Sequence, residues 1–349
     1  MSTMRTLLSG AIGTALAIAA ALPATAAPPA DTVAAIRARG QLVCGVSPSA
    51  AGFATQSGST WKGFEVDYCR AVASVVLGDA EKVRIVPVPA GQRFAGLEQG
   101  EIDLLTRNTT WTLEREAGNN IAFAAITYYD GQGFMLRDER GIRRVQQMDG
   151  LKVCVEAATT TEQNVAEYAR AMRMRLTVVP VADATKAQAA FLAGFCDALT
   201  SDLSVLAGFR RSLGSRADEF SLLGEIISKE PLSMVVRRGD WRFFDIVRWT
   251  HFAMVAAEEL NMDGETLRQL RSRSEADLAG AGTEVQRLLG RVGASGRLLG
   301  LDPDWAARLV IQVGNYREVW ERNIGPLGIR RGLNLTWNQG GLLYAPPMR

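Results

Sequence analysis

Histidine is almost absent from this chain of 349 residues, since His251 is its only one. Multi-histidine metal sites and Ser-His-Asp catalysis therefore lack their raw material, and we expect His251 to be structural. Net charge is nearly absent too, because 39 Lys and Arg oppose 37 Asp and Glu. No basic block with interleaved aromatics is present to hold a phosphate backbone. The composition thus predicts no metal, no cofactor and no nucleic-acid partner.

Long apolar runs are absent after the first 27 residues, so nothing later in the chain is expected to span a bilayer. The start itself combines Arg5, an uncharged run over 7–22 and Ala-Thr-Ala at 24–26, which is typical of a cleaved secretory signal. A membrane anchor is the alternative, but the run is short and prolines follow it closely. Residues 1–26 are therefore predicted to be a signal peptide, and the mature protein to be periplasmic in a Gram-negative bacterium.

Cysteine is scarce, with Cys44, Cys69, Cys154 and Cys196 as the full set. In an oxidising compartment, four cysteines favour disulfides over catalysis. We pair each cysteine with its near neighbour, Cys44 with Cys69 and Cys154 with Cys196. Crossed pairings and four buried reduced thiols remain open at this stage.

The rest of the composition is that of a globular protein, with 47% hydrophobic and 22% charged residues and a length that suggests about two domains. Strand-like and helical stretches alternate twice along the chain, which indicates two α/β lobes with helix-covered sheets. In the first lobe we expect strands at 41–46, 83–88 and 102–105 and helices at 66–77 and 92–99. In the second we expect strands at 151–155, 176–181 and 196–201 and helices at 162–172, 183–193 and 202–210.

Two extended stretches, 126–136 and 231–236, are placed where the chain would cross between the lobes. Two crossing strands without a large shared core form a hinge, and clefts between domains are where small ligands bind. The predicted division is 27–130 for the first part of lobe one, 131–230 for lobe two, and 231–349 for the return to lobe one. This last part should be mostly helical, over 243–259, 265–289 and 303–322, with a surface coil at 334–349.

The sequence resembles the family 3 extracellular solute-binding proteins, the polar amino-acid receptors of ABC importers. The resemblance rests on Gly-Phe-Glu-Val-Asp-Tyr at 63–68, where the family usually has an aliphatic residue in place of Tyr68. Four further segments resemble the general L-amino-acid-binding subfamily. They are Arg-Asn-Thr-Thr-Trp-Thr at 107–112, the stretch 128–134, Ile-Ser-Lys-Glu-Pro-Leu at 227–232, and the stretch 337–347.

The resemblance implies a fold and a function. The expected fold is α/β, a type II two-lobed periplasmic binding protein. Its two parallel or mixed sheets carry helices on both faces, are joined by a two-strand hinge and are followed by a helical C-terminal extension. The expected function is to capture L-amino acids in the interlobe cleft and deliver them to an ABC transporter permease, without enzymatic activity.

A receptor for free amino acids needs a cation for the carboxylate and an anion for the ammonium group, because burying either charge unpaired is costly. Arg115 follows a predicted strand by a short loop, and a guanidinium can grip a carboxylate with two parallel bonds. The family's Thr-x-Thr-x-x-Arg loop maps onto Thr110 and Arg115. Asp202 ends another predicted strand, where the family places the acid that receives the ammonium group. Either charged residue could instead be structural, Arg115 in a surface ion pair and Asp202 as a helix cap.

Further binding candidates surround these residues. The turn after strand 151–155 offers threonine hydroxyls and the backbone N–H groups of a helix start, which suit an anion. Which of its threonines touches ligand stays open. Asn108 belongs to a segment that carries the resemblance, and an aromatic or hydroxyl wall would shield the ion pairs. The added candidates are Thr159, Thr160, Thr161, Asn108, Phe53, Ser47 and Trp111.

Two other functions use the same scaffold. One is an exported enzyme, such as a dehydratase of cyclic acids, with Glu65 or Glu156 as general acid or base. The other is a receptor that senses its ligand through a partner protein. The combination of Arg115 and Asp202 favours a zwitterionic ligand and therefore the transport receptor.

Overall fold

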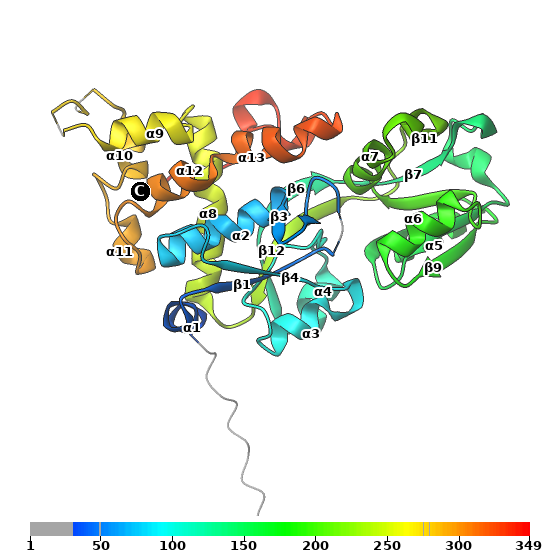
Figure 1. The fold of residues 1–349 in the computed structure, drawn as a ribbon, viewed down its shortest axis with the longest axis horizontal. Coiled ribbons are helices and arrows are strands. Elements are labelled where there is room, and N and C mark those ends of the chain that lie inside the picture. The colour runs from blue at the N-terminus through cyan, green and yellow to red at the C-terminus, as the bar shows by residue number, and fades with distance from the viewer. Residues whose placement is uncertain (1–30, 49, 275, 279) are drawn as a thin grey trace, which may run out of the picture.

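The computed structural model describes residues 31–48, 50–274, 276–278 and 280–349. The predicted signal peptide, 1–26, lies outside these residues. Two five-stranded sheets organise the described chain, and Figure 1 shows each sheet in a lobe of its own. In the described chain, no helix combines the length and the apolar character needed to cross a membrane.

The lobe-one sheet has the strand order β4-β1-β5-β12-β6. Its strands are β1 (Leu42–Val46), β4 (Val83–Pro87), β5 (Leu104–Leu105), β6 (Ile121–Asp130) and β12 (Glu230–Arg237). β4, β1 and β5 run parallel, whereas β12 is antiparallel to both β5 and β6. The apolar face of α2 (Phe64–Leu77) packs with α8 (Trp241–Glu259) on one side, and α3 (Arg93–Glu98) covers the other.

The lobe-two sheet has the order β11-β7-β10-β8-β9, with β8, β9 and β10 parallel and β7 antiparallel to its neighbours. Its strands are β7 (Gln132–Arg137), β8 (Lys152–Glu156), β9 (Thr177–Val181), β10 (Ala198–Asp202) and β11 (Phe220–Leu222). Helices α6 (Ala184–Leu192) and α7 (Leu203–Ser212) pack on one face and α5 (Thr160–Ala171) on the other. Both lobes are therefore mixed α/β sheets with helices on both faces, as the sequence predicted.

The hinge is formed where the chain crosses between the sheets. β6 ends lobe one at Asp130 and β7 begins lobe two at Gln132, so Gly131 alone separates them. A Cβ atom at Gly131 would lie 2.4 Å from Cγ2 of Ile226, which requires glycine at this close approach. The chain returns after β11 and enters lobe one again at Glu230. The proposed lobe boundaries at 130 and 230 lie at these two crossings.

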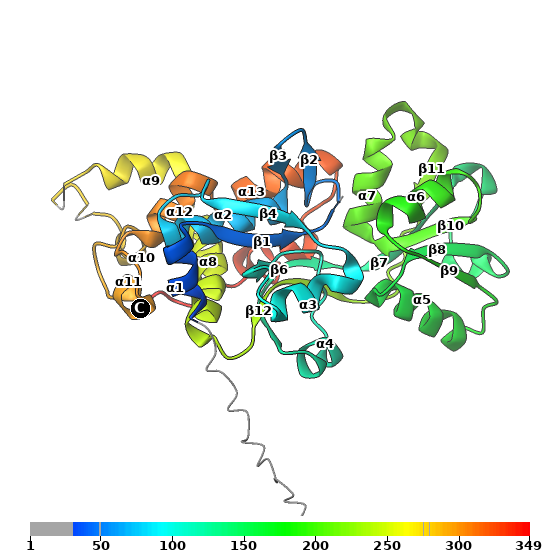
Figure 2. The same cartoon turned by 60° about the horizontal axis from the view of Figure 1, so that its bottom comes forward.

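The C-terminal part differs from the prediction in two places. The helix expected over 265–289 is two separate ones, α9 (Gly264–Arg271) and α10 (Thr283–Leu288). The helix expected over 303–322 breaks at Gly314, whose φ of 107° leaves the helical region, so that α12 (Trp305–Val313) is followed by α13 (Tyr316–Asn323). Asn315 starts α13 with a capping box, a signal that periodicity alone did not reveal. Figure 2 shows α9, α10 and α12 against lobe one, on the side away from lobe two.

The remaining helices and strands are short and pack on lobe one, whereas lobe two adds the short turns Asp138–Arg140, Val145–Met148 and Gly214–Glu219. Those on lobe one are α1 (Thr32–Arg39), the hairpin β2 (Thr55–Ser57) and β3 (Thr60–Lys62), α4 (Leu113–Gly118) and α11 (Ser295–Leu299). The chain end runs over lobe one as single turns, Gly325–Leu327, Gly332–Asn334 and Trp337–Gln339. The side chain of Asn334 bonds both backbone groups of Tyr129, at 2.7 and 3.0 Å, and so covers the edge strand β6.

Both disulfides join the cysteines that the sequence paired. Cys44 in β1 bonds Cys69 in α2, with 5.9 Å between the Cα atoms, and Cys154 in β8 bonds Cys196, with 5.6 Å. Each bridge ties a strand to another element of the same lobe. His251 lies buried in α8, where its Nδ1 is 2.8 Å from the hydroxyl of Tyr68. Burial lowers the pKa of His251 to about 3, so this histidine is neutral and structural.

Candidate functional site

A small polar cavity lies between the lobes, where the carboxyl ends of parallel strands from both sheets face each other. This edge is where open α/β sheets hold ligands. The cavity measures about 40 Å³. It is lined by Ser47, Ala50, Arg93, Arg107, Asn108, Thr110, Arg115, Glu156, Thr159, Thr160, Thr161, Ala184, Ser201, Asp202 and Val205. The structure thus brings together all the predicted binding residues except Phe53 and Trp111.

Arg115 approaches the cavity from α4, whose start is capped by the hydroxyl of Thr112. Its Nη1 donates to the backbone oxygen of Thr110 at 2.9 Å, which fixes the guanidinium at the cleft. Within the described chain Arg115 forms no ion pair, neither with Glu114 nor with Glu116. Burial lowers the pKa of Arg115, and the nearby carboxylates only partly offset this cost. The cleft therefore holds a desolvated cation that an anion would stabilise.

Asp202 is the opposite charge, at the end of β10. It precedes α7, yet its side chain accepts no capping hydrogen bond. The carboxyl group is buried and receives no hydrogen bond from the described residues. Burial first, and then the charges of Asp130 and Glu230, raise the pKa of Asp202 well above its usual range. An ammonium group placed here would relieve all three unfavourable effects.

The threonine turn between β8 and α5 supplies a third binding element. Thr159 caps α5, accepting from the backbone of Glu162 at 3.2 Å, and Ala158 before it has a φ of 60°. The backbone N–H groups of Thr160 and Thr161 find no acceptor in the described chain. They point out of the first turn of a twelve-residue helix, where the dipole favours negative charge. This turn can receive a carboxylate jointly with Arg115.

Direct bonds across the cavity show that the lobes are closed on each other. Arg93 donates to the backbone oxygen of Ala158 at 2.8 Å, and Arg107 donates to Glu156 at 3.0 Å. Arg93 and Arg107 belong to lobe one, whereas their partners belong to lobe two. Sequence reasoning did not single out either arginine, because nothing local marks a side chain that reaches across a hinge.

Asn108 is held in its place by the acid of the Gly-Phe-Glu-Val-Asp motif. The backbone of Asn108 has a φ of 35°, and its N–H donates a short hydrogen bond to Glu65. Burial raises the pKa of Glu65 to about 8, so this carboxyl stays largely protonated at neutral pH. Glu65 does not line the cavity. Glu65 of this motif therefore holds the loop that carries Asn108 and Thr110 in place, and it does not itself contact the cavity.

The two predicted aromatic residues lie elsewhere. Phe53 is 1% exposed in the lobe-one core, where it packs edge-on against Phe64 and Tyr128. Trp111 stacks on Phe123 at 5.5 Å and donates to Glu116 at 2.8 Å. Both rings stabilise lobe one instead of walling the cavity, which corrects the expectation of an aromatic shield. An aromatic ring that is close to a binding site in sequence can pack either against the ligand or in the apolar core. The sequence alone does not distinguish these two locations.

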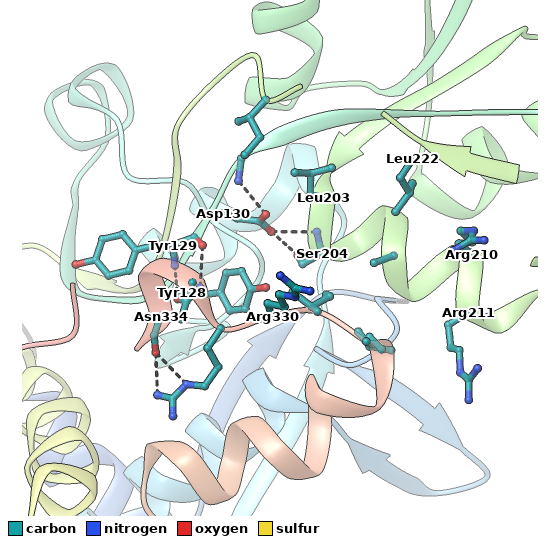
Figure 3. Close-up of a pocket in the computed structure, with 18 of the residues that line it drawn as sticks. Tyr128, Tyr129, Asp130, Leu203, Ser204, Arg210, Arg211, Leu222, Arg330 and Asn334 are labelled. Atoms are coloured by element: carbon teal, nitrogen blue, oxygen red, sulfur yellow. Dashed lines mark hydrogen bonds between the residues drawn. The ribbon is translucent and has the colours of Figure 1, made fainter. Parts of the chain in front are cut away.

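A second cavity, of about 650 Å³, lies on the other side of α7 (Figure 3). Leu203, Ser204 and Arg211 of α7 face it from lobe two, and Arg330 and Asn334 face it from lobe one. Figure 3 shows Asp130 at its inner end, bonded by Ser204. This cavity is larger than the cleft, but it lacks a buried cation facing a buried acid. We therefore assign ligand binding to the smaller one. The described residues contain no group of three or more His, Cys, Asp or Glu placed to hold a metal.

Comparison with known proteins identifies the family. Residues 42–269 match the model of the bacterial extracellular solute-binding proteins, family 3. The chain belongs to this family. The resemblance noted in the sequence is thereby confirmed, and so is the function of a solute-binding protein.

Similar family 3 proteins cover nearly the whole chain. The glutamate/glutamine/aspartate/asparagine-binding protein BztA of Rhodobacter capsulatus is 46% identical over 334 residues, 95% of this chain and 96% of BztA. The general L-amino acid-binding periplasmic protein AapJ of Rhizobium johnstonii is 43% identical over 352 residues, 98% of this chain and 99% of AapJ. A solved periplasmic binding protein of an ABC transporter from Brucella ovis, with glutathione bound, has a TM-score of 0.87 and 45% identity. That similarity covers 92% of this chain and all of the Brucella chain.

Proposed function

We propose that this protein is a periplasmic receptor that closes over an L-amino acid and delivers it to the permease of an ABC transporter in a Gram-negative cell. The observation that carries the proposal is the pairing of a partly buried Arg115 with a buried Asp202 in one interlobe cavity. A free amino acid presents the complementary charges on a single carbon. The names of BztA and AapJ support the same ligand class.

In this proposal each lobe binds a different part of the ligand. Arg115 of lobe one and the N–H groups of Thr160 and Thr161 hold the carboxylate, while Asp202 of lobe two receives the ammonium group. Ligand contacts from both lobes form together only when the cleft is closed, so binding stabilises the closed state. The receptor therefore needs no other energy source to trap its ligand.

The positions of the candidate acids support a receptor over an enzyme. Glu65 is buried outside the cavity and bonded to Asn108, and Glu156 is paired with Arg107. Neither acid is free to move a proton to and from a bound molecule. We therefore propose that the protein has no catalytic role.

The first experiment is a binding panel on the mature protein after unfolding and refolding to strip carried-over ligand. It contains the twenty amino acids, glutathione, sugars and dicarboxylic acids. Ligand at 100 times its Kd stabilises the fold by about 2.7 kcal/mol, which thermal unfolding detects easily. Shifts with L-amino acids support the proposal, and silence across all twenty contradicts it.

Arg115→Ala tests the site within the same panel. Removing one partner of a buried charge pair costs about 2–5 kcal/mol, so Kd should rise at least about thirtyfold for every ligand that wild type binds. The loss should be uniform because Arg115 binds the shared carboxylate. Arg211→Ala is the matched control, since Arg211 lines the second cavity and lies outside the cleft. A wild-type Kd in Arg115→Ala would refute the assignment of this residue.

A further inference from the structure

Glu230 is a buried hinge acid that neither the sequence analysis nor the proposed function uses. It is the first residue of β12, where the chain returns to lobe one, and it is 1% exposed. In the antiparallel register it faces Asp130, the last residue of β6. It does not line the ligand cavity. Its carboxylate therefore lies at the point about which the lobes turn, directly behind the binding residues.

Four side chains from three parts of the molecule donate to this carboxylate. Thr110 of lobe one and Thr160 of lobe two donate to Oε2, at 2.5 and 3.0 Å. Asn164 of lobe two and Ser228 of the returning hinge segment donate to Oε1, at 2.7 and 2.5 Å. Both oxygens of Glu230 are therefore occupied by donors from the two lobes and the hinge.

The bonds at Oε2 depend on lobe closure. The hydroxyl oxygens of Thr110 and Thr160 are 3.3 Å apart across the cleft, and the same carboxylate oxygen lies between their two lobes. Opening the lobes must move Thr160 away from Thr110, so Glu230 cannot keep both donors. A buried carboxylate that loses a donor is destabilised, because the lost hydrogen bond no longer offsets the cost of removing the charge from water. This arrangement favours the closed state before any ligand contact is counted.

The same bonds set the direction of the threonine hydroxyls. A carboxylate can only accept, so the hydrogens of Thr110 and Thr160 point at Glu230. Their lone pairs are then what remains to face the ligand. Hydroxyl lone pairs accept from an ammonium group and repel a carboxylate. Glu230 thus fixes the polarity of two groups that line the cavity without touching the ligand itself.

We propose that Glu230 is a positioning residue that couples closure of the lobes to recognition of the ligand's ammonium group, by holding the hydroxyls of Thr110 and Thr160 from both lobes at once. This inference rests on the proposed function, since it assigns the regulation of the same cleft. In this assignment the two hydroxyls bind the ammonium group of the ligand, next to Asp202. Arg115 and the backbone of the threonine turn bind its carboxylate.

The test is Glu230→Gln, which keeps the shape but leaves one acceptor oxygen and adds an NH₂ donor. Asn164 and Ser228 donate to Oε1, so the amide oxygen is favoured at that position and the NH₂ group at Oε2. Both threonine hydroxyls must then turn, because there they meet a donor in place of an acceptor. We expect Kd to rise at least tenfold for every amino acid that wild type binds, while the melting temperature of the ligand-free protein stays within about 1 °C of wild type. Ser228→Ala is the matched control. It removes one donor from the same carboxylate without affecting either threonine, and its Kd should stay within about twofold of wild type.

The distance between spin labels at the exposed positions Ser57 and Met172 measures closure without any ligand. Glu230→Gln should populate longer distances than wild type does, both with and without amino acid. A wild-type Kd together with a wild-type distance distribution would overturn the proposal. So would an equal loss of affinity in Ser228→Ala, or a fall in melting temperature large enough to account for the loss. If wild type binds no amino acid, the proposed function fails, and the distances alone decide on Glu230.

Discussion

Three carboxyl groups gather where the hinge meets the cleft, and their charges act on one another. Asp202 lines the cavity, while Asp130 and Glu230 lie behind it on paired strands. Burial is the main cause that raises the pKa of Asp130 to about 6, and the charge of Glu230 adds to it against the bonds from Ser204. Burial and the charges of Asp130 and Glu230 likewise raise the pKa of Asp202 well above its usual range. The ligand-free cleft therefore takes up protons more readily than ordinary carboxylates do.

These raised pKa values predict that affinity for an amino acid falls as the pH drops through the raised pKa of Asp202, and again through about 6, where Asp130 takes up a proton. The ammonium group of the ligand stabilises the charged carboxylates, so ligand and proton compete, and binding releases protons. Each proton displaced changes Kd by up to about tenfold per pH unit. Calorimetric titration between pH 8 and pH 5, in two buffers of different ionisation enthalpy, measures both Kd and the protons released. Asp202→Asn should bind weakly at pH 8 and show a flatter profile. A constant Kd over this range would contradict the argument.

At this scale the sequence reveals residues whose roles follow from local position. Asp202 stands at the end of one strand, and Thr110 and Arg115 follow the end of another, so the fold pattern alone brings them to the cleft. Glu230, Arg93 and Arg107 were not found because the partners that place them at the cleft, Thr110, Ala158 and Glu156, are 49 to 120 positions away in the chain. Phe53 and Trp111 were misplaced because an aromatic ring near a site is equally suited to the core.

At the scale of elements, each of the two disulfides stabilises one lobe by joining two parts of its fold. Cys154 lies in β8 and Cys196 lies just before β10, so this bridge staples neighbouring strands of lobe two and closes a loop of 42 positions. The second bridge, from Cys44 in β1 to Cys69 in α2, fixes a helix to the lobe-one sheet over 25 positions. Loops of these lengths remove chain entropy from the unfolded state worth about 3–4 kcal/mol each.

Replacing both cysteines of lobe two, as Cys154→Ser with Cys196→Ser, should therefore lower the free energy of unfolding by about 3–4 kcal/mol. Urea denaturation followed by circular dichroism measures the difference. Wild type in excess reducing agent should lose at least as much, since both bridges are then open. A variant as stable as oxidised wild type would show that the bridge is unimportant for the fold. The affinity for ligand at low urea should change little, because neither cysteine lines the cleft.

At the scale of elements, the sequence predicts helices and strands that have a regular hydrophobic period, and it misses interruptions within a helix. The parallel strands of both sheets were expected within two residues, since buried β-branched runs between turns are clear signals. The start of β6 at Ile121 and the short strand β11 were missed. One continuous helix was predicted over 303–322 because the apolar residues keep a helical period on both sides of Gly314. Only the positive φ of that glycine and the cap at Asn315 divide it. Such breaks depend on tertiary contacts, here the packing of α12 and α13 against α2 and α8.

For the whole molecule, function requires that the two lobes approach each other closely. One close approach outside the cavity is between α7 of lobe two and the loop after β1 of lobe one. A Cβ atom on Gly208 would lie 2.8 Å from the backbone oxygen of Ala51 and 2.9 Å from its Cβ. Backbone cannot give way as a flexible side chain does. The two crossing segments predict a hinge position from the sequence, but they do not predict this contact, because it exists only between folded lobes.

Gly208→Val should therefore hold the lobes apart and weaken ligand binding without unfolding lobe two. Valine is a better helix former than glycine, so α7 itself should not suffer. The closed state must either shift or be lost, and we expect Kd for an amino acid to rise at least tenfold, about 1.4 kcal/mol of closure energy. Ala207→Val is the control on the neighbouring residue, which lines the larger cavity where the two added methyl groups have room. Calorimetry gives Kd, and small-angle scattering in saturating ligand should show a larger radius of gyration for Gly208→Val than for Ala207→Val. Equal affinities and equal radii in the two variants would mean that closure does not depend on this contact.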